Sequence, residues 1–267
     1  MTAAPYRLPP CIERFFVEFV NKPFEEHERS DAWVKEVVDH DWGYRTKTII
    51  DQGRKDFSVG WNGLTPRDKV LIYCYYYMQM HTVSGFHVFQ RGLKDHRLNF
   101  VGNVVFVDFG CGPLTSGISL AWHHMAEQPS AEEGLLFHYI GIDTCKEMLA
   151  HAEQASKMGG LFHRDSTFDF LTPAQSLEAV PQLIGKYRSG RELTVILNCS
   201  YLFASRQLRV AGLISFISGL LKEHMNGDKV CLTFQNPDSD GLNTKWERFK
   251  AEVKELRSLS KCSECVY

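Results

Sequence analysis

The chain has 267 residues, of which 44% are hydrophobic and 23% charged, and its formal net charge is -2 at pH 7. These values are typical of a globular protein with one large domain, or with one domain and an appendage. The near-neutral charge, with Lys and Arg spread along the chain, argues against a nucleic-acid partner, because phosphate binding normally shows as a basic stripe. No apolar stretch approaches about 18 residues, which argues against a membrane-spanning helix.

The eight cysteines are scattered, and most have apolar neighbours. This pattern favours buried free thiols in a reducing compartment, so we expect a cytoplasmic protein without a disulfide framework. Residues 1–10 contain no apolar run, and we expect no signal peptide. Cys262 and Cys265 have the spacing of half a zinc site, but no second pair of this kind exists. We therefore expect no metal site.

Before about residue 100 the hydrophobic pattern is helical. Apolar residues recur at helix spacing from Ile12 to Val20 and from Trp33 to Val38. Thr65 and the proline after it are typical of the start of a third helix, which we expect to reach about residue 93 unless Gly85 breaks it. The pattern predicts a helical N-terminal cap over residues 1–98.

After residue 100 the pattern alternates between strand and helix. Expected strands cover residues 104–109, 138–143, 160–163, 193–198 and 229–235, and expected helices cover residues 115–127, 146–157, 205–224 and 246–256. This alternation predicts an α/β domain over residues 99–267, with a mostly parallel sheet and helices on both faces. Ligands of such sheets bind at the carboxyl ends of the strands.

The first motif is a glycine turn after the first expected strand, with the sequence Asp108-Phe-Gly110-Cys111-Gly112. Two glycines let the backbone turn tightly and leave room for a ligand against it. The next helix then points its unpaired N–H groups at that ligand, a favourable place for a carboxylate or phosphate. A tight turn without a ligand is the alternative interpretation.

The second motif, Gly141-Ile-Asp143-Thr144, ends the second expected strand and continues to Met148-Leu149. The Asp143 carboxylate could accept both hydroxyls of a ribose through charge-assisted hydrogen bonds. It could instead cap the following helix, a role that Thr144 could also fill.

Together the two motifs resemble the signature of class I S-adenosylmethionine-dependent methyltransferases, over roughly residues 100–240. The resemblance implies a Rossmann-like fold and S-adenosyl-L-methionine as cofactor. It assigns the cofactor site to Asp108, Gly110, Cys111, Gly112, Asp143, Thr144, Asp165, Ser166, Asn198 and Cys199. The classical dinucleotide fingerprint fails, because Thr115 stands at the place of its third glycine.

The resemblance also implies separate roles for these residues. Gly110 and Gly112 would pass beneath the methionine part of the cofactor, and Asp108 would orient their loop. Asp143 would hold the ribose. Asp165, taken as the acid after the third strand, would bind the adenine amino group. The fourth strand ends at Asn198 and Cys199, near the transferred methyl group.

The chain departs from the family pattern at three places, one of which is a stretch of about nine residues around 128–134 that lengthens the connection into the second expected strand. Pro113-Leu114 replaces the third glycine common in the family, which predicts a stiffer loop. After Gln235 the remaining residues suffice for little beyond one helix, whereas the family usually adds a helix and an antiparallel strand pair. We expect a sheet shortened at its C-terminal strands, or a truncated form of a longer chain.

No catalytic residue is assigned. The cluster Tyr73, Tyr75, Tyr76, Tyr77 either packs a helix against the sheet or places one or two rings over the sulfonium or a cationic substrate. Four histidines are candidates for a general base, although most such residues are structural: His81, His87, His123 and His124.

The predicted function is an enzyme that moves a methyl group from the cofactor to N, O or S of a small-molecule acceptor by in-line displacement, with the cap as a lid. An RNA or protein methyltransferase is one alternative, and a non-catalytic cofactor-binding regulatory protein is another.

Overall fold

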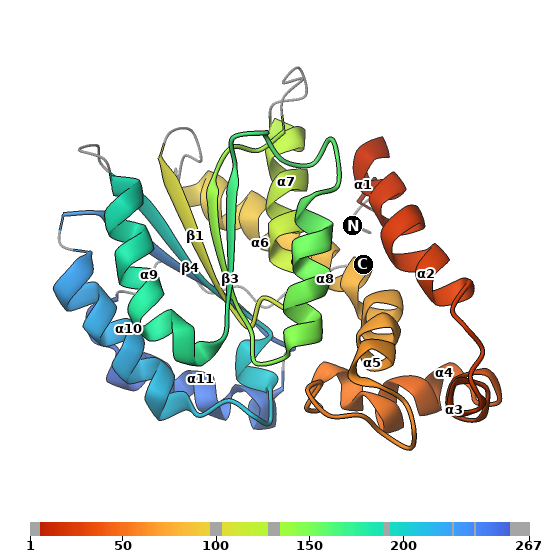
Figure 1. Ribbon diagram of the computed structural model, residues 1–267. Coiled ribbons are helices and arrows are strands. Elements are labelled where there is room, and N and C mark those ends of the chain that lie inside the picture. Colours follow the sequence, from red (N-terminus) through yellow and green to blue (C-terminus); the bar gives the residue numbers. More distant parts are fainter. Residues whose placement is uncertain are drawn as a thin grey trace, which may run out of the picture.

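The structure, a computed structural model, describes residues 6–96, 103–127, 134–188, 193–225, 227–237 and 239–256. Its centre is a parallel five-stranded sheet in the order β3-β2-β1-β4-β5 (Figure 1). The strands are β1 (Val104–Phe109), β2 (His138–Ile142), β3 (Thr167–Leu171), β4 (Thr194–Ser200) and β5 (Lys229–Gln235). The strand order reverses between β1 and β4, and sheets of this kind bind ligands in the crevice outside the carboxyl ends of the strands at such a point. The predicted Rossmann-like α/β fold is confirmed.

Helices cover both faces of this sheet. They are α6 (Gln79–His96), α7 (Thr115–Glu127), α8 (Lys146–Ser156), α9 (Pro173–Arg188), α10 (Val210–His224) and α11 (Asp240–Glu252). Successive strand residues point to opposite faces. Phe106 of β1 therefore packs in one core with α6, α7 and α8, whereas its neighbours Val105 and Val107 pack in the other core with α9, α10 and α11.

The N-terminal part of the chain is a series of short helices with interspersed π-helical turns. They are α1 (Pro10–Phe15), η1 (Phe16–Asn21), α2 (Lys22–Glu25), α3 (Asp31–Trp33), η2 (Val34–Val38), α4 (Trp42–Tyr44), η3 (Arg45–Ile49), η4 (Asp51–Gly53), α5 (Pro66–Tyr73) and η5 (Cys74–Met78). Helix α5 begins where predicted, because Thr65 and Asp68 form a capping box in which each side chain accepts the backbone N–H of the other.

Gly85 does not break the helix, which continues from α5 through η5 into α6. The glycine instead permits close packing of α6 on α7, since a Cβ built there would lie 2.5 Å from Oγ of Ser119. The N-terminal helices share a core with the sheet, and Phe15 and Phe106 belong to the same buried cluster. The division at residue 98 and the lid role remain predictions.

The predicted strand over residues 160–163 is wrong. Gly160 has a φ of +85°, a left-handed turn that a strand excludes, and Phe162 makes only an isolated bridge to Leu135. The third strand follows later, at Thr167–Leu171, and leads into α9, a helix that is not among those expected from the sequence.

The described sheet ends at β5, and α11 follows it. Residues 239–256 contain no further strand. Cys262 and Cys265 lie outside the described residues. Within the described ranges, no helix is long and apolar enough to cross a membrane, and no group of His, Cys, Asp or Glu could hold a metal ion.

Candidate functional site

The loop after β1 turns at two glycines. Gly110 and Gly112 have φ values of +72° and +52°, and the N–H groups of Gly110 and Cys111 both donate to the carbonyl of Ile142 at the end of β2. A Cβ built on Gly110 would lie 3.0 Å from Leu202, whereas one on Gly112 would meet nothing within 4 Å. Of the two glycines, only Gly112 therefore has open space above it, on the side where a side chain would stand.

Leu114 stands at the position of the family's third glycine and keeps a left-handed backbone, with a φ of +74°. This conformation costs a non-glycine residue about 1–2 kcal/mol. The side chain is fully buried against Gly117 of α7, and its burial offsets the cost. The loop is thus anchored into the core at this point.

Asp143 ties the end of β2 to the glycine loop. Its Oδ2 accepts the Gly112 N–H at 3.0 Å, and its Oδ1 accepts the Cys145 N–H at 2.9 Å. Burial raises the pKa of this carboxyl, and the backbone N–H groups around it act in the opposite direction. A carboxylate has about four lone-pair positions, so these bonds leave room for ligand hydroxyls.

Neither Asp143 nor Thr144 is the N-cap of α8. The N-cap is Cys145, whose side chain accepts no helix N–H. Thr144 is exposed, and its carbonyl accepts the hydroxyl of Ser58 from the N-terminal part of the chain at 3.4 Å.

Asp108 is 1% exposed and lies in a buried polar network. Its two oxygens accept the Tyr139 hydroxyl at 2.6 Å and the Asn198 amide at 2.7 Å. The Asn198 Oδ1 in turn accepts the hydroxyls of Ser200 and Thr233. Burial raises the pKa of Asp108 to about 6. The network fixes the carboxyl ends of β1, β4 and β5 to one another and leaves Asp108 and Asn198 without exposed polar atoms for direct ligand contact.

The two cysteines of the predicted site are core residues. Cys111 packs in the core on the α7 face, and Cys199 packs in the opposite core. Burial raises the pKa of both thiols, so they remain protonated at neutral pH.

Asp165 and Ser166 are not brought together with the glycine loop. Both precede β3, and β3 runs parallel to β2, so they lie at the amino ends of the strands. Asp165 is 69% exposed and pairs with His163, while the Ser166 hydroxyl donates to the carbonyl of Leu135. A five-residue strand spans roughly 17 Å, which separates this edge from Asp143.

The polar residue that does end β3 is Thr172, which is not among the residues predicted for the site. The Asp143 N–H donates to the carbonyl of Leu171, so Thr172 follows directly beside Asp143. Its N–H and hydroxyl both donate to Gln175 Oε1. The alternation of residues 167–171 followed by Thr-Pro was the available signal.

An aromatic cluster joins the N-terminal helices to the loop after β4. Its members are Tyr73, Tyr77, His81 and Tyr201, and the His81 ring stacks on Tyr201 with centroids 3.8 Å apart. Tyr201 has a left-handed φ of +58°, a strained conformation typical of functional sites. The Tyr73 hydroxyl lies 3.1 Å from Nδ1 of His81, and burial lowers the His81 pKa to about 3.

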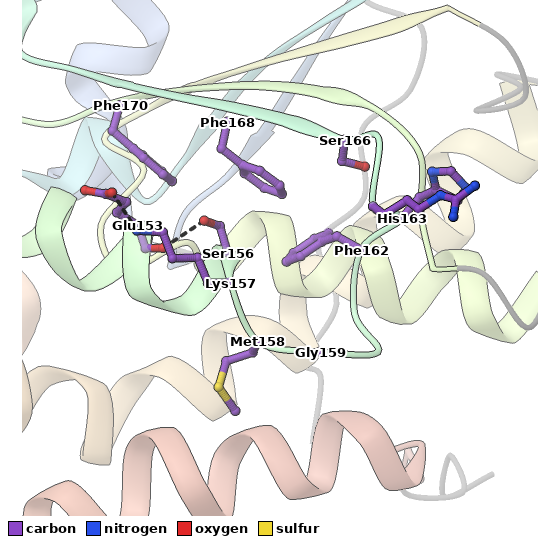
Figure 2. Close-up of a pocket in the computed structure, with 11 residues that line it drawn as sticks. Glu153, Ser156, Lys157, Met158, Gly159, Phe162, His163, Ser166, Phe168 and Phe170 are labelled. Atoms are coloured by element: carbon purple, nitrogen blue, oxygen red, sulfur yellow. Dashed lines mark hydrogen bonds and ion pairs between the residues drawn. The ribbon is translucent and has the colours of Figure 1, made fainter.

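A separate pocket of about 400 Å³ lies beside β3 (Figure 2). Phe162, Phe168 and Phe170 line it together with Ser166 and the end of α8 around Lys157. One residue of the predicted cofactor site, Ser166, thus belongs to this pocket and not to the crevice at Gly112.

No protein-family model matches the chain, and no curated protein matches it. Among solved structures, the magnesium protoporphyrin IX methyltransferase of Synechocystis PCC 6803 with bound S-adenosylmethionine is 16% identical, with 85% of this chain and 87% of that chain covered and a TM-score of 0.36. The plantazolicin methyltransferase BpumL, in complex with a desmethylplantazolicin analogue and S-adenosylhomocysteine, is 12% identical, with 91% and 70% covered and a TM-score of 0.33. At these identities and TM-scores, nothing known of either enzyme is carried over to this chain.

Proposed function

We propose that this protein is an S-adenosyl-L-methionine-dependent methyltransferase acting on a small-molecule acceptor. The observation that carries the proposal is the pair Gly112 and Asp143 at the carboxyl ends of β1 and β2. Asp143 holds the Gly112 N–H at 3.0 Å, and the space above Gly112 is open. The Gly141-Ile-Asp143 continuation to Met148-Leu149 favours this cofactor over a dinucleotide.

The residues around Gly112 suit the cofactor's polar groups. Thr115 opens α7, and its Oγ1 is buried without a hydrogen-bond partner among the described residues. The unpaired N–H groups of that helix end favour the carboxylate of the methionine part. The free lone pairs of Asp143 suit the ribose hydroxyls. Thr172 and Gln175, beside Asp143, are better placed for the adenine than Asp165.

When bound, the cofactor supplies a methyl group that the positive sulfonium already activates. The protein then has to bind, orient and exclude water. The Asp108–Asn198 network serves orientation, because it fixes the strand ends beneath the ligand. The low pKa of His81 keeps its ring neutral, so the aromatic cluster adds no positive charge near a sulfonium.

Calorimetric titration with S-adenosylmethionine and S-adenosylhomocysteine tests the proposal. Gly112→Val should abolish binding, because the branched side chain fills the open space. Gly227→Val is the matched control. Gly227 is also left-handed, with a φ of +91° and nothing within 4 Å of a built Cβ, but it lies in the turn before β5 at the opposite edge.

A screen of small-molecule acceptors with radiolabelled cofactor should then detect methyl transfer. No cofactor binding by the wild-type chain would refute the proposal. Binding without any transfer would favour the non-catalytic alternative, and transfer restricted to RNA or protein would favour the macromolecular one.

A further inference from the structure

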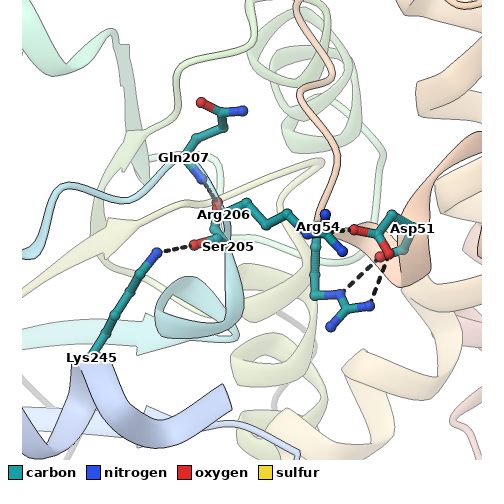
Figure 3. Close-up of polar contacts among 6 residues, drawn as sticks. All are labelled: Asp51, Arg54, Ser205, Arg206, Gln207 and Lys245. Carbon is teal, nitrogen blue, oxygen red and sulfur yellow. Dashed lines mark hydrogen bonds and ion pairs between the residues drawn. The ribbon is translucent and has the colours of Figure 1, made fainter. Parts of the chain in front are cut away.

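Asp51 lies between two arginines that come from different parts of the fold. Its Oδ1 lies 2.9 Å from Nη2 of Arg54, and its Oδ2 lies 2.9 Å from Nε of Arg206. Figure 3 shows Asp51 between the two arginine side chains. Arg54 follows η4 in the N-terminal part, and Arg206 belongs to the loop between β4 and α10. Each guanidinium thus takes one oxygen of a single carboxylate.

The segment that carries Asp51 is strained and sits on the aromatic cluster. Asp51, Gln52 and Gly53 have consecutive left-handed φ values of 46°, 55° and 82°. Gly53 packs against the Tyr73 ring, with a built Cβ 3.0 Å away from it. Strain of this kind persists only where the surroundings hold it, and it concentrates at ligand sites.

Asp51 and the two arginines that it contacts carry more positive than negative charge. Lys245 of α11 donates to the carbonyl of Ser205, directly before Arg206. Two arginine side chains therefore share the Asp51 carboxylate, and a third cation, Lys245, is held at the residue before Arg206. Arg206 is 68% exposed and uses only its Nε, so its terminal amino groups have no partner among the described residues. An arginine fork of this kind suits a second, planar carboxylate.

We propose that Arg54 and Arg206 bind a carboxylate of the methyl acceptor, and that Asp51 occupies this position until the acceptor replaces it. The inference rests on the proposed function, since it names the acceptor class of the same site. The aromatic cluster beside Gly53 would contact the apolar part of such an acceptor. Excess positive charge would also speed its association.

A purely structural ion pair makes a different prediction. If Asp51 and Arg206 only joined two segments, removing either side chain would loosen the same contact and change ligand binding in the same direction. If Asp51 competes with a ligand carboxylate, Asp51→Asn should strengthen carboxylate binding, whereas Arg206→Gln should weaken it.

The test measures binding, with and without saturating S-adenosylhomocysteine, of a panel of small carboxylates that includes benzoate, 4-hydroxybenzoate and succinate. Each is paired with its primary amide, and affinities come from saturation-transfer NMR and calorimetry. We expect at least one carboxylate to bind the wild type about tenfold or more tighter than its amide. Arg206→Gln should remove this preference, and Asp51→Asn should increase it. Arg248→Gln, which changes an exposed arginine of α11 paired with Glu252, is the control and should change nothing.

Equal binding of acids and amides, binding of neither, or shifts of the same sign in Asp51→Asn and Arg206→Gln would overturn the inference. Failure of the wild type to bind S-adenosylhomocysteine would refute the proposed function separately, because carboxylate binding is also measured without it.

Discussion

Asp108 and Asn198 stand opposite each other on β1 and β4, and the Asn198 amide donates a hydrogen bond of 2.7 Å to the Asp108 carboxylate. Both side chains are at most 1% exposed. The carboxylate is therefore stabilised by protein hydrogen bonds instead of water, and these bonds only partly offset the cost of burying its charge.

This burial predicts a specific pH dependence of stability. The folded-state pKa of Asp108, about 6, lies above the ordinary 3.8, so folding favours the protonated form. Its stabilising contribution is complete below about pH 4 and is lost as the pH rises through about 6. The rise of the Asp108 pKa from 3.8 to about 6 corresponds to about 3 kcal/mol of stability. Urea unfolding at several pH values should show the wild type losing about this much relative to Asp108→Asn. A constant difference between the two would contradict the prediction.

Asp143→Ala should weaken S-adenosylmethionine binding by about 1.5–3 kcal/mol, the range for hydrogen bonds to a charged group. The substitution removes the proposed ribose acceptor and also releases the Gly112 N–H. Calorimetry measures the change, and thermal unfolding checks that the fold is retained. Asp165→Ala, at the opposite edge of the sheet, should leave affinity unchanged. Unchanged affinity in Asp143→Ala would remove this residue from the site.

Gly85→Ala should destabilise the protein by about 1–3 kcal/mol, because the new methyl group collides with Ser119 where α6 meets α7. Gly92→Ala is a control in the same helix, where a built Cβ meets nothing within 4 Å. It should stabilise by up to about 1 kcal/mol, since alanine favours helix. The free energy of unfolding in urea distinguishes them, and equal effects would argue against the close helix contact.

A chain that begins near residue 98 should aggregate. Phe15 and Phe89 belong to the same buried cluster as Phe106 of the sheet, so the truncation exposes a large apolar surface. Expression trials and size-exclusion chromatography provide the measurement. A soluble fragment with native cofactor affinity would show that the N-terminal segment has a separate role. Loss of acceptor methylation alone would support a lid.

Strand prediction worked for the buried strands and for β5 at one edge of the sheet, and it failed for β3 at the other edge. β1 and β4 are nearly all apolar and buried, which makes their patterns unmistakable. β3 is half-buried throughout, and Asp169 interrupts its apolar residues. The strand accommodates this carboxylate because it accepts a hydrogen bond from the Tyr187 hydroxyl. Pro181 inside α9 similarly obscures that helix, although Thr172 and the proline after it are the same start signal that identified α5.

In the candidate site, too, some residues could be predicted from the sequence and others could not. Gly112 and Asp143 could be predicted because each follows a recognisable strand, and local sequence determines the turn. The aromatic cluster could not, since His81 and Tyr201 are distant in sequence and meet only through packing of α6 against the loop after β4. No periodicity encodes a contact of that kind.

The unbroken helix from α5 into α6 has a mechanical consequence. The same rod belongs to the N-terminal part and, at Gly85, presses against α7 over the sheet. A hinge rotation of the whole N-terminal part would have to bend this rod or separate α6 from α7. Small molecules would therefore reach the crevice through excursions of short loops, which occur in nanoseconds to microseconds, and not through slower domain opening.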